Sequence, residues 1–185
     1  VREIIKHPVE EIHHVEIDEQ VIETSKRYFP SVSSGHSDPR VKLFIEDGVE
    51  FVKKNNGYDI IIIDSTDPMG TAEGLFSREF YKSVFDALND DGIMVAQTES
   101  PFFYKNLIKR LHTDLSSIYP YAAIYTSVIP TYPGALWTFS MGSKSIDPLS
   151  IDPAEIEDLD AKYYSKRIHK NSFDLPPFVA NLLKE

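Results

Sequence analysis

A chain of 185 residues, 42% hydrophobic and 26% charged, has the length and composition of one globular domain with a substantial core. A net charge of -10, with no long run of Lys or Arg, argues against a nucleic-acid partner and suits a cationic small substrate. The absence of cysteine excludes disulfides, thiolate metal sites and a cysteine nucleophile.

No apolar run approaches the ~18 residues that a transmembrane helix needs, and the first residues lack a signal-peptide pattern. We therefore expect a cytoplasmic protein without a membrane partner. The chain begins with Val1 rather than Met, so a targeting segment before it stays open.

The first third of the chain alternates strand and helix patterns. In order, we predict the end of a helix at 1–7, a strand at 12–17, a helix at 18–29 capped by Asp18 and closed by Pro30, a loop at 31–39, a strand at 41–45, and a short helix after Asp47-Gly48.

Residues 58–63 contain four consecutive isoleucines, which predicts a strand buried on both faces, as in the middle of a parallel sheet. Asp64 and Asp67 follow this strand. The carboxyl ends of strands are where open α/β sheets bind ligands, although a solvated turn explains the same two acids.

The second half of the chain continues the alternation of strand and helix patterns and ends in two strands without a helix between them. We predict a helix through Phe80 and Val84, a turn at 89–92, a strand at 93–97, a helix at 103–118, and two antiparallel strands at 122–128 and 136–141. This order predicts an α/β fold: a Rossmann-like, doubly wound, mostly parallel sheet with an antiparallel edge. We expect residues 1–144 to form this Rossmann-like domain, and 145–185 a helical tail packed on it.

Three successive predicted strands are each followed by an acid, namely Glu16, Asp47 and Asp64. Parallel strands bring these ends to one rim of a sheet. Glu16 there could accept hydrogen bonds from ribose hydroxyls, and Asp47-Gly48 could meet an adenine amino group. Helix capping is the competing interpretation of Glu16 and Asp47, since acids favour helix N-termini.

Other candidates have weaker support. His13 and His14 lie mid-strand without a third ligand nearby, which argues against a metal site. Core packing is the default for Trp137, and Ser65 and Thr66 most simply satisfy backbone groups in the turn.

A set of motifs runs in unbroken order from residue 1 to about 170: VEIDEQVIETSKRYFP, DPRVKLFIEDGVEFV, YDIIIIDSTDPMG, EGLFSREFY, AQTES and IPTYPGALWTFSMGSK. These motifs closely resemble those of the spermidine synthases, the polyamine aminopropyltransferases, and DSTDP and IPTYP are the most specific. The resemblance makes residues 1–144 a partial aminopropyltransferase catalytic domain. The resemblance implies a methyltransferase-like fold. It also implies transfer of the aminopropyl group of decarboxylated S-adenosylmethionine to putrescine, giving spermidine and methylthioadenosine, with no metal or further cofactor.

The resemblance also implies roles for single residues. It assigns Glu16 to the ribose hydroxyls, Asp47 and Gly48 to the adenine, and Asp64 to the proton of the attacking amine. It assigns Asp67 to diamine binding, Tyr132 to the side of the substrate amine, and Gln97 and Glu99 to the diamine channel.

Family members also have a glycine-rich GGGDGG loop after a first strand, and an N-terminal β-domain; neither is present before Val1. We therefore expect that these 185 residues alone form no complete sheet and are inactive, because two strands would lack a neighbour. We expect the full-length protein to be a homodimer or homotetramer. Three alternatives stay open. The first is aminopropyl transfer to another amine, namely agmatine, cadaverine or spermidine. The second is methyl transfer, and the third is a non-catalytic relative that binds a nucleoside or a polyamine.

Overall fold

The structure, a computed structural model, describes residues 1–184 except for the side chain of Thr71. The chain divides into two compact units, Val1–Asn55 and the part from Asn56 onward, and each is described by itself. Residues 145–184 belong to the second unit, and Glu185 lies outside the described residues. The division that we expected at residue 144 stays a prediction.

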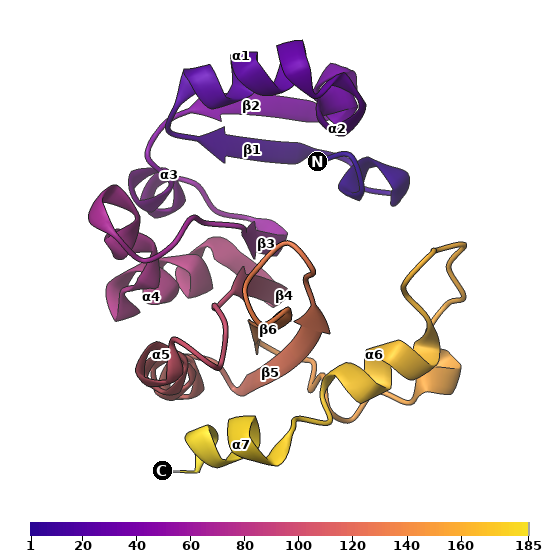
Figure 1. Ribbon diagram of the computed structural model, residues 1–185. Helices are drawn as coiled ribbons and strands as arrows, with labels where there is room; N and C mark the ends of the chain where they lie inside the picture. Colours follow the sequence, from indigo (N-terminus) through magenta and orange to yellow (C-terminus); the bar gives the residue numbers. More distant parts are fainter. Residues whose placement is uncertain (185) are drawn as a thin grey trace. The chain divides into compact units, whose positions relative to one another are not determined.

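The first unit is built on a two-stranded parallel sheet. β1 (Ile12–Glu16) pairs with β2 (Val41–Ile45) from Ile12 opposite Val41 to Glu16 opposite Ile45. The helices around this sheet are α1 (Glu19–Tyr28), α2 (Pro30–Ser33) and α3 (Gly48–Lys54), with short 3-10 segments at Ile4–Lys6 and Ser34–Ser37 (Figure 1). The parallel register brings the carboxyl ends of both strands to the same edge.

Side-chain capping explains where two of these helices begin. As expected, Asp18 caps α1, and its Oδ1 accepts a hydrogen bond from the Gln20 amide at 2.8 Å. Asp47 caps α3 in the same way. The prediction of a loop at 31–39 is wrong in part, because Pro30 starts the short helix α2. Proline suits this first helical position, where no backbone donor is needed.

Arg40 fastens the N-terminal segment to β2. Its guanidinium donates to the carbonyl oxygens of Ile5 at 2.7 Å and of His7 and Val9 at 3.2 Å, and it pairs with Asp38 at 2.9 Å. The hydrogen bonds from Arg40 lower the pKa of Asp38 to about 2. One side chain thus satisfies three carbonyls of an irregular segment.

The second unit contains a four-stranded sheet with the order β3-β4-β6-β5. Its strands are β3 (Tyr58–Ile63), β4 (Leu88–Gln97), β5 (Tyr121–Val128) and β6 (Leu136–Ser143). β3 and β4 are parallel, whereas β6 is antiparallel to both β4 and β5. The α/β class with an antiparallel edge is therefore confirmed, and the described strands form two separate sheets rather than one.

The expectation that β3 is buried on both faces is wrong for this chain. Ile60 and Ile62 are 59% and 55% exposed, whereas Ile63 is buried. Within residues 1–184, β3 pairs with β4 and forms the edge of its sheet. Independently of this edge position, the face that carries Ile60 and Ile62 is exposed. The expected turn at 89–92 is also wrong, because β4 already begins at Leu88, with an irregular register opposite β3.

Helices α4 (Arg78–Ala87) and α5 (Lys105–Ile118) supply the core of this unit through side chains at helical spacing. Those almost fully buried are Phe80, Tyr81, Val84, Ile108, Leu111 and Leu115. The C-terminal segment contacts the same unit through aromatic rings: Phe173, after α6 (Lys166–Ser172), lies 5.5 Å from Tyr125 of β5. Phe178 of α7 (Pro177–Ala180) stacks on Phe102 at 5.3 Å.

Candidate active site

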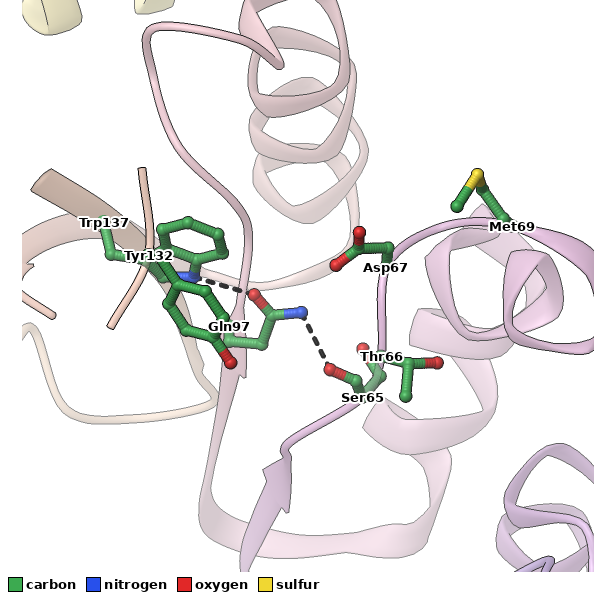
Figure 2. A pocket seen from close by; sticks show the side chains of 7 residues that line it. All are labelled: Ser65, Thr66, Asp67, Met69, Gln97, Tyr132 and Trp137. Atoms are coloured by element: carbon green, nitrogen blue, oxygen red, sulfur yellow. Dashed lines mark hydrogen bonds between the residues drawn. The ribbon is translucent and has the colours of Figure 1, made fainter. Parts of the chain in front are cut away.

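A cavity of about 380 Å³ opens in the second unit, where the segment after β3 meets the end of β4 and the start of β6. It is lined by Ser65, Thr66, Asp67, Met69, Gln97, Tyr132 and Trp137 (Figure 2). Asp67, Gln97 and Tyr132 were predicted as site residues from the sequence, and the fold brings all three to this cavity.

Gln97 is fixed at both ends of its amide. Its Nε2 donates to the carbonyl oxygen of Ser65 at 3.0 Å, and its Oε1 accepts from Nε1 of Trp137 at 2.8 Å (Figure 2). These bonds join the segment after β3, the end of β4 and β6. The cavity wall is therefore organised around one amide whose orientation is defined by its partners.

The aromatic wall consists of Tyr132 and Trp137. Their rings stack with centroids 4.3 Å apart and an interplanar angle of 26°. Tyr132 belongs to the β5–β6 connection, which turns at Gly134 with a φ of +80°; a Cβ there would lie 2.9 Å from the ring of Phe102. The connection can pack this closely on Phe102 only because residue 134 lacks a side chain.

One acidic group lines this cavity, and a second is buried two residues beyond the lining residue Gln97. Asp67 directs its carboxylate into the cavity (Figure 2), from the position before Pro68. Glu99, two residues after β4, is only 1% exposed, and its Oε1 has no hydrogen-bond partner among the described residues. Burial raises the pKa of Glu99, and the negative charge of Asp67 raises it further. Burial, Asp67 and Glu99 likewise raise the pKa of Tyr104.

Two carboxyl groups beside an aromatic wall favour a cationic ligand. A cation close to Asp67 and Glu99 would offset their repulsion, and a ring face attracts positive charge. A protonated amine with an aliphatic chain combines both kinds of contact.

Asp64 immediately follows β3 and its side chain is exposed. It adjoins the lining residue Ser65 in the chain, but it is not among the residues that line the cavity. Its expected role in taking the proton of the amine stays a prediction.

Four lining residues were missed by sequence reasoning: Ser65, Thr66, Met69 and Trp137. Trp137 carried the clearest signal, because an indole N–H needs a partner when its ring is buried and Tyr132 lies five residues earlier. Ser65 and Thr66 carried no signal of a site, since Ser and Thr after a strand are common in any turn.

The predicted nucleoside residues lie in the first unit, at the carboxyl edge of its sheet. Glu16 ends β1, and its Oε1 accepts from the Asp18 amide at 3.0 Å. Oδ1 of Asp47 accepts from the Val49 amide at 2.8 Å, so capping, the competing interpretation, is present for Asp47. These bonds engage one oxygen of each carboxylate, and a ligand role for Glu16, Asp47 and Gly48 stays a prediction.

Neither a metal site nor a membrane span is found within the described part of the chain. No group of three or more His, Cys, Asp or Glu side chains among the described residues is arranged to hold a metal ion. No helix in this part of the chain is both long and apolar enough to cross a membrane.

Comparison with known proteins gives the family. Residues 1–151 match the model of the spermine/spermidine synthase domain. The chain belongs to the spermine/spermidine synthase family. Its whole length aligns at 50% identity with the polyamine aminopropyltransferases of Thermoanaerobacter sp. (strain X514) and Moorella thermoacetica, and at 46% with that of Bacillus subtilis (strain 168).

Solved structures of this family share the fold. The chain superposes with a TM-score of 0.94 and 39% identity on a spermidine synthase in complex with the transition state analogue AdoDATO, covering 99% of this chain. The spermidine synthase of Thermotoga maritima gives a TM-score of 0.91 at the same identity. The chain spans 64% of each of these two structures, and 68% and 66% of the Thermoanaerobacter and Moorella relatives.

Proposed function

We propose that the protein is a spermidine synthase, which transfers the aminopropyl group of decarboxylated S-adenosylmethionine to putrescine. The observation that carries this proposal is the cavity in which Asp67, Gln97, Tyr132 and Trp137 converge, with the buried Glu99 beside them. Its combination of carboxyl groups and aromatic rings suits a chain with an ammonium group, and its volume lies within the range of small-molecule sites. Membership of the family supports the same reaction class.

In the proposed reaction, a neutral amine nitrogen of putrescine attacks the aminopropyl carbon that is bonded to the sulfonium. The new C–N bond forms as the C–S bond breaks, and methylthioadenosine leaves as a neutral thioether. The nitrogen then carries a surplus proton. We assign its acceptance to Asp64, at the end of β3, as general base.

The remaining residues would bind and orient the amine. Asp67 and Glu99 would hold the distal ammonium, while the hydroxyl of Tyr132 and the amide of Gln97 would orient the attacking end. Burial of Glu99 strengthens its interaction with a cation, because little water screens the pair. A substrate of fixed length and charge is thereby favoured.

The donor would use the first unit. We assign Glu16 to the ribose hydroxyls, and Asp47 with Gly48 to the adenine. Both carboxylates keep a second oxygen beyond the one engaged by a neighbouring amide. The electrophilic carbon is already activated by the sulfonium, so the reaction as proposed requires no further cofactor.

The test uses the full-length protein with decarboxylated S-adenosylmethionine and putrescine, and measures spermidine and methylthioadenosine. Asp64→Asn should lower kcat by about 10²–10⁴-fold, as expected for loss of a general base, while nucleoside binding is kept. Methyl transfer without methylthioadenosine release would refute the assignment. Turnover unchanged in Asp64→Asn would remove Asp64 from the mechanism.

Agmatine, cadaverine and spermidine are the competing acceptors, and parallel assays with each amine separate them. A non-catalytic binding relative would bind the nucleoside without turnover. The inactivity of these 185 residues alone, and the dimeric or tetrameric state of the full-length protein, stay predictions. Circular dichroism and urea unfolding of the 185 residues test whether they fold; a cooperative transition with native-like helix content would refute the expectation.

A further inference from the structure

Glu99 has a backbone conformation that few residues with side chains adopt. Its φ is +77°, in the left-handed region, and its side chain is almost fully buried. Such a conformation persists only where the surroundings impose it, and it is frequent at functional sites. The residues around Glu99 show what imposes the left-handed conformation here.

Thr138 of β6 makes both backbone contacts that define this conformation. The Thr98 amide donates to the carbonyl oxygen of Thr138 at 2.9 Å, whereas the Thr138 amide donates to the carbonyl oxygen of Glu99, also at 2.9 Å. In a regular antiparallel ladder, a single residue would exchange both bonds with Thr138. Two residues therefore lie opposite one, which is a β-bulge directly after β4, and bulges redirect side chains.

The side chain of Thr138 reinforces the bulge. Its Oγ1 lies 2.8 Å from the carbonyl oxygen of Glu99 and 3.1 Å from that of Thr98, within donating distance of both. Ser140 Oγ donates to Thr98 Oγ1 at 3.3 Å, and Thr98, Thr138 and Ser140 are all fully buried. Buried hydroxyls with several partners each form a rigid support for the residue that they hold.

We propose that Thr138 is a positioning residue for the acceptor amine: its hydroxyl and backbone amide hold the bulge that orients the buried carboxyl group of Glu99, two residues after Gln97 of the cavity wall. The inference rests on the proposed function, because it concerns how the same site binds its amine. Thr138 touches no reacting atom. It acts through Glu99, whose Oε1 is buried and has no hydrogen-bond partner among the described residues.

The test compares two variants of the full-length protein, one without the hydroxyl of Thr138 and one without its methyl group. Thr138→Val keeps the shape and removes the hydroxyl, whereas Thr138→Ser keeps the hydroxyl and removes the methyl group. Thr138→Val should raise the KM for putrescine about fivefold, as expected for loss of one buried hydrogen bond, and leave the KM for the nucleoside donor unchanged. Thr138→Ser should stay near the wild type.

A double-mutant cycle with Glu99→Gln separates positioning from general damage. In the Glu99→Gln background, Thr138→Val should have little further effect on the KM for putrescine, because the charge that it positions is gone. An undiminished effect there would overturn the proposal. It would also be overturned by a wild-type KM in Thr138→Val, or by equal losses in Thr138→Val and Thr138→Ser.

Melting temperatures of all variants accompany the kinetics. If Thr138→Val does not fold, Ser140→Ala tests the same hydroxyl network; it should raise the KM for putrescine in the same direction, and an unchanged KM would overturn the proposal. Failure of the proposed function is distinct, because the wild-type protein would then release no methylthioadenosine with putrescine.

Discussion

The ring of Tyr132 stacks on the indole of Trp137, with their centroids 4.3 Å apart. The indole N–H of Trp137 is at the same time donated to Gln97. One residue of β6 thus orders the β5–β6 connection through its ring and the end of β4 through its nitrogen. This double contact places Trp137 at the junction of two segments that line the cavity.

Trp137→Phe should weaken amine binding without abolishing catalysis. Phenylalanine can keep the stack on Tyr132, but Oε1 of Gln97 loses its donor at 2.8 Å. We expect the KM for putrescine to rise about fivefold, the usual effect of losing one buried hydrogen bond. Steady-state kinetics with putrescine varied at saturating donor give the value.

Tyr132→Phe is the matched variant, because it keeps the stack and removes the hydroxyl that is proposed to orient the amine. It should lower kcat more than Trp137→Phe does. If both variants change only the KM for the donor, the cavity does not bind the amine.

The buried carboxyl of Glu99 should make stability depend on pH in a defined direction. Burial raises the pKa of Glu99 above 4.5, so the folded protein keeps a proton that the unfolded chain releases between 4.5 and the higher folded value. The contribution of Glu99 to stability therefore falls as the pH rises through this window, and it does not change further above it.

Glu99→Gln removes this titration. Urea unfolding of the wild type and of Glu99→Gln, at a series of pH values from about 4 upward, should give free energies whose difference shifts in favour of the variant as the pH rises. Other titrating groups cancel in this comparison. Parallel curves would show that Glu99 is not protonated preferentially in the folded state.

Gly134→Ala should disturb the loop that carries Tyr132. Two penalties combine, the φ of +80° and the approach of 2.9 Å between the new Cβ and the ring of Phe102. The left-handed conformation alone costs a residue with a side chain ~1–3 kcal/mol. We expect a lower melting temperature together with a higher KM for putrescine.

Gly70 provides the control, because its φ is +60° but nothing lies within 4 Å of the position that a Cβ would take. Gly70→Ala should therefore show the conformational cost without the clash. Equal losses of stability in the two variants would mean that Phe102 yields readily to the added methyl group.

The pair of Asp38 and Arg40 should make the first unit sensitive to acid at a defined pH. The pKa of Asp38 falls from 3.8 in an unperturbed carboxyl to about 2 in the folded protein. Its contribution to stability is therefore complete above pH 3.8 and is lost as the pH falls through about 2. Acid titration of the full-length protein, followed by circular dichroism, measures the loss.

Asp38→Asn should abolish this part of the acid transition, while Arg40→Gln should also lower stability at neutral pH. The second variant removes the guanidinium that satisfies the carbonyl oxygens of Ile5, His7 and Val9. If Arg40→Gln and Asp38→Asn unfold alike at neutral pH, these three carbonyls gain nothing from Arg40.

Sequence patterns predicted the local elements well, because helix and strand signals are short-range. Asp18 and Asp47 were placed at helix starts by their neighbours alone, and the antiparallel finish followed from the two last strands. The missing strand neighbour was expected, but the exposure of Ile60 and Ile62 was not, since burial of a face depends on the elements packed on it. A run of isoleucines indicates a strand that is stable when covered, but it does not reveal whether a covering element is present.

The site was predictable only in part for a similar reason. Asp67, Gln97 and Tyr132 belong to recognisable motifs, but the role of Trp137 depends on partners 5 to 40 residues away in the chain. The bulge at Glu99 depends on Thr138, and no local pattern marks it. Long-range hydrogen bonds of this kind become visible only when the strands are placed.

The uncovered edge of β3 has a practical consequence. A strand with exposed isoleucines at the edge of its sheet is a template to which another chain can add, and natural proteins blunt such edges with charged residues. On the face of β3, positions 60 and 62 carry no charge. We therefore expect preparations of these 185 residues alone to aggregate with rising concentration.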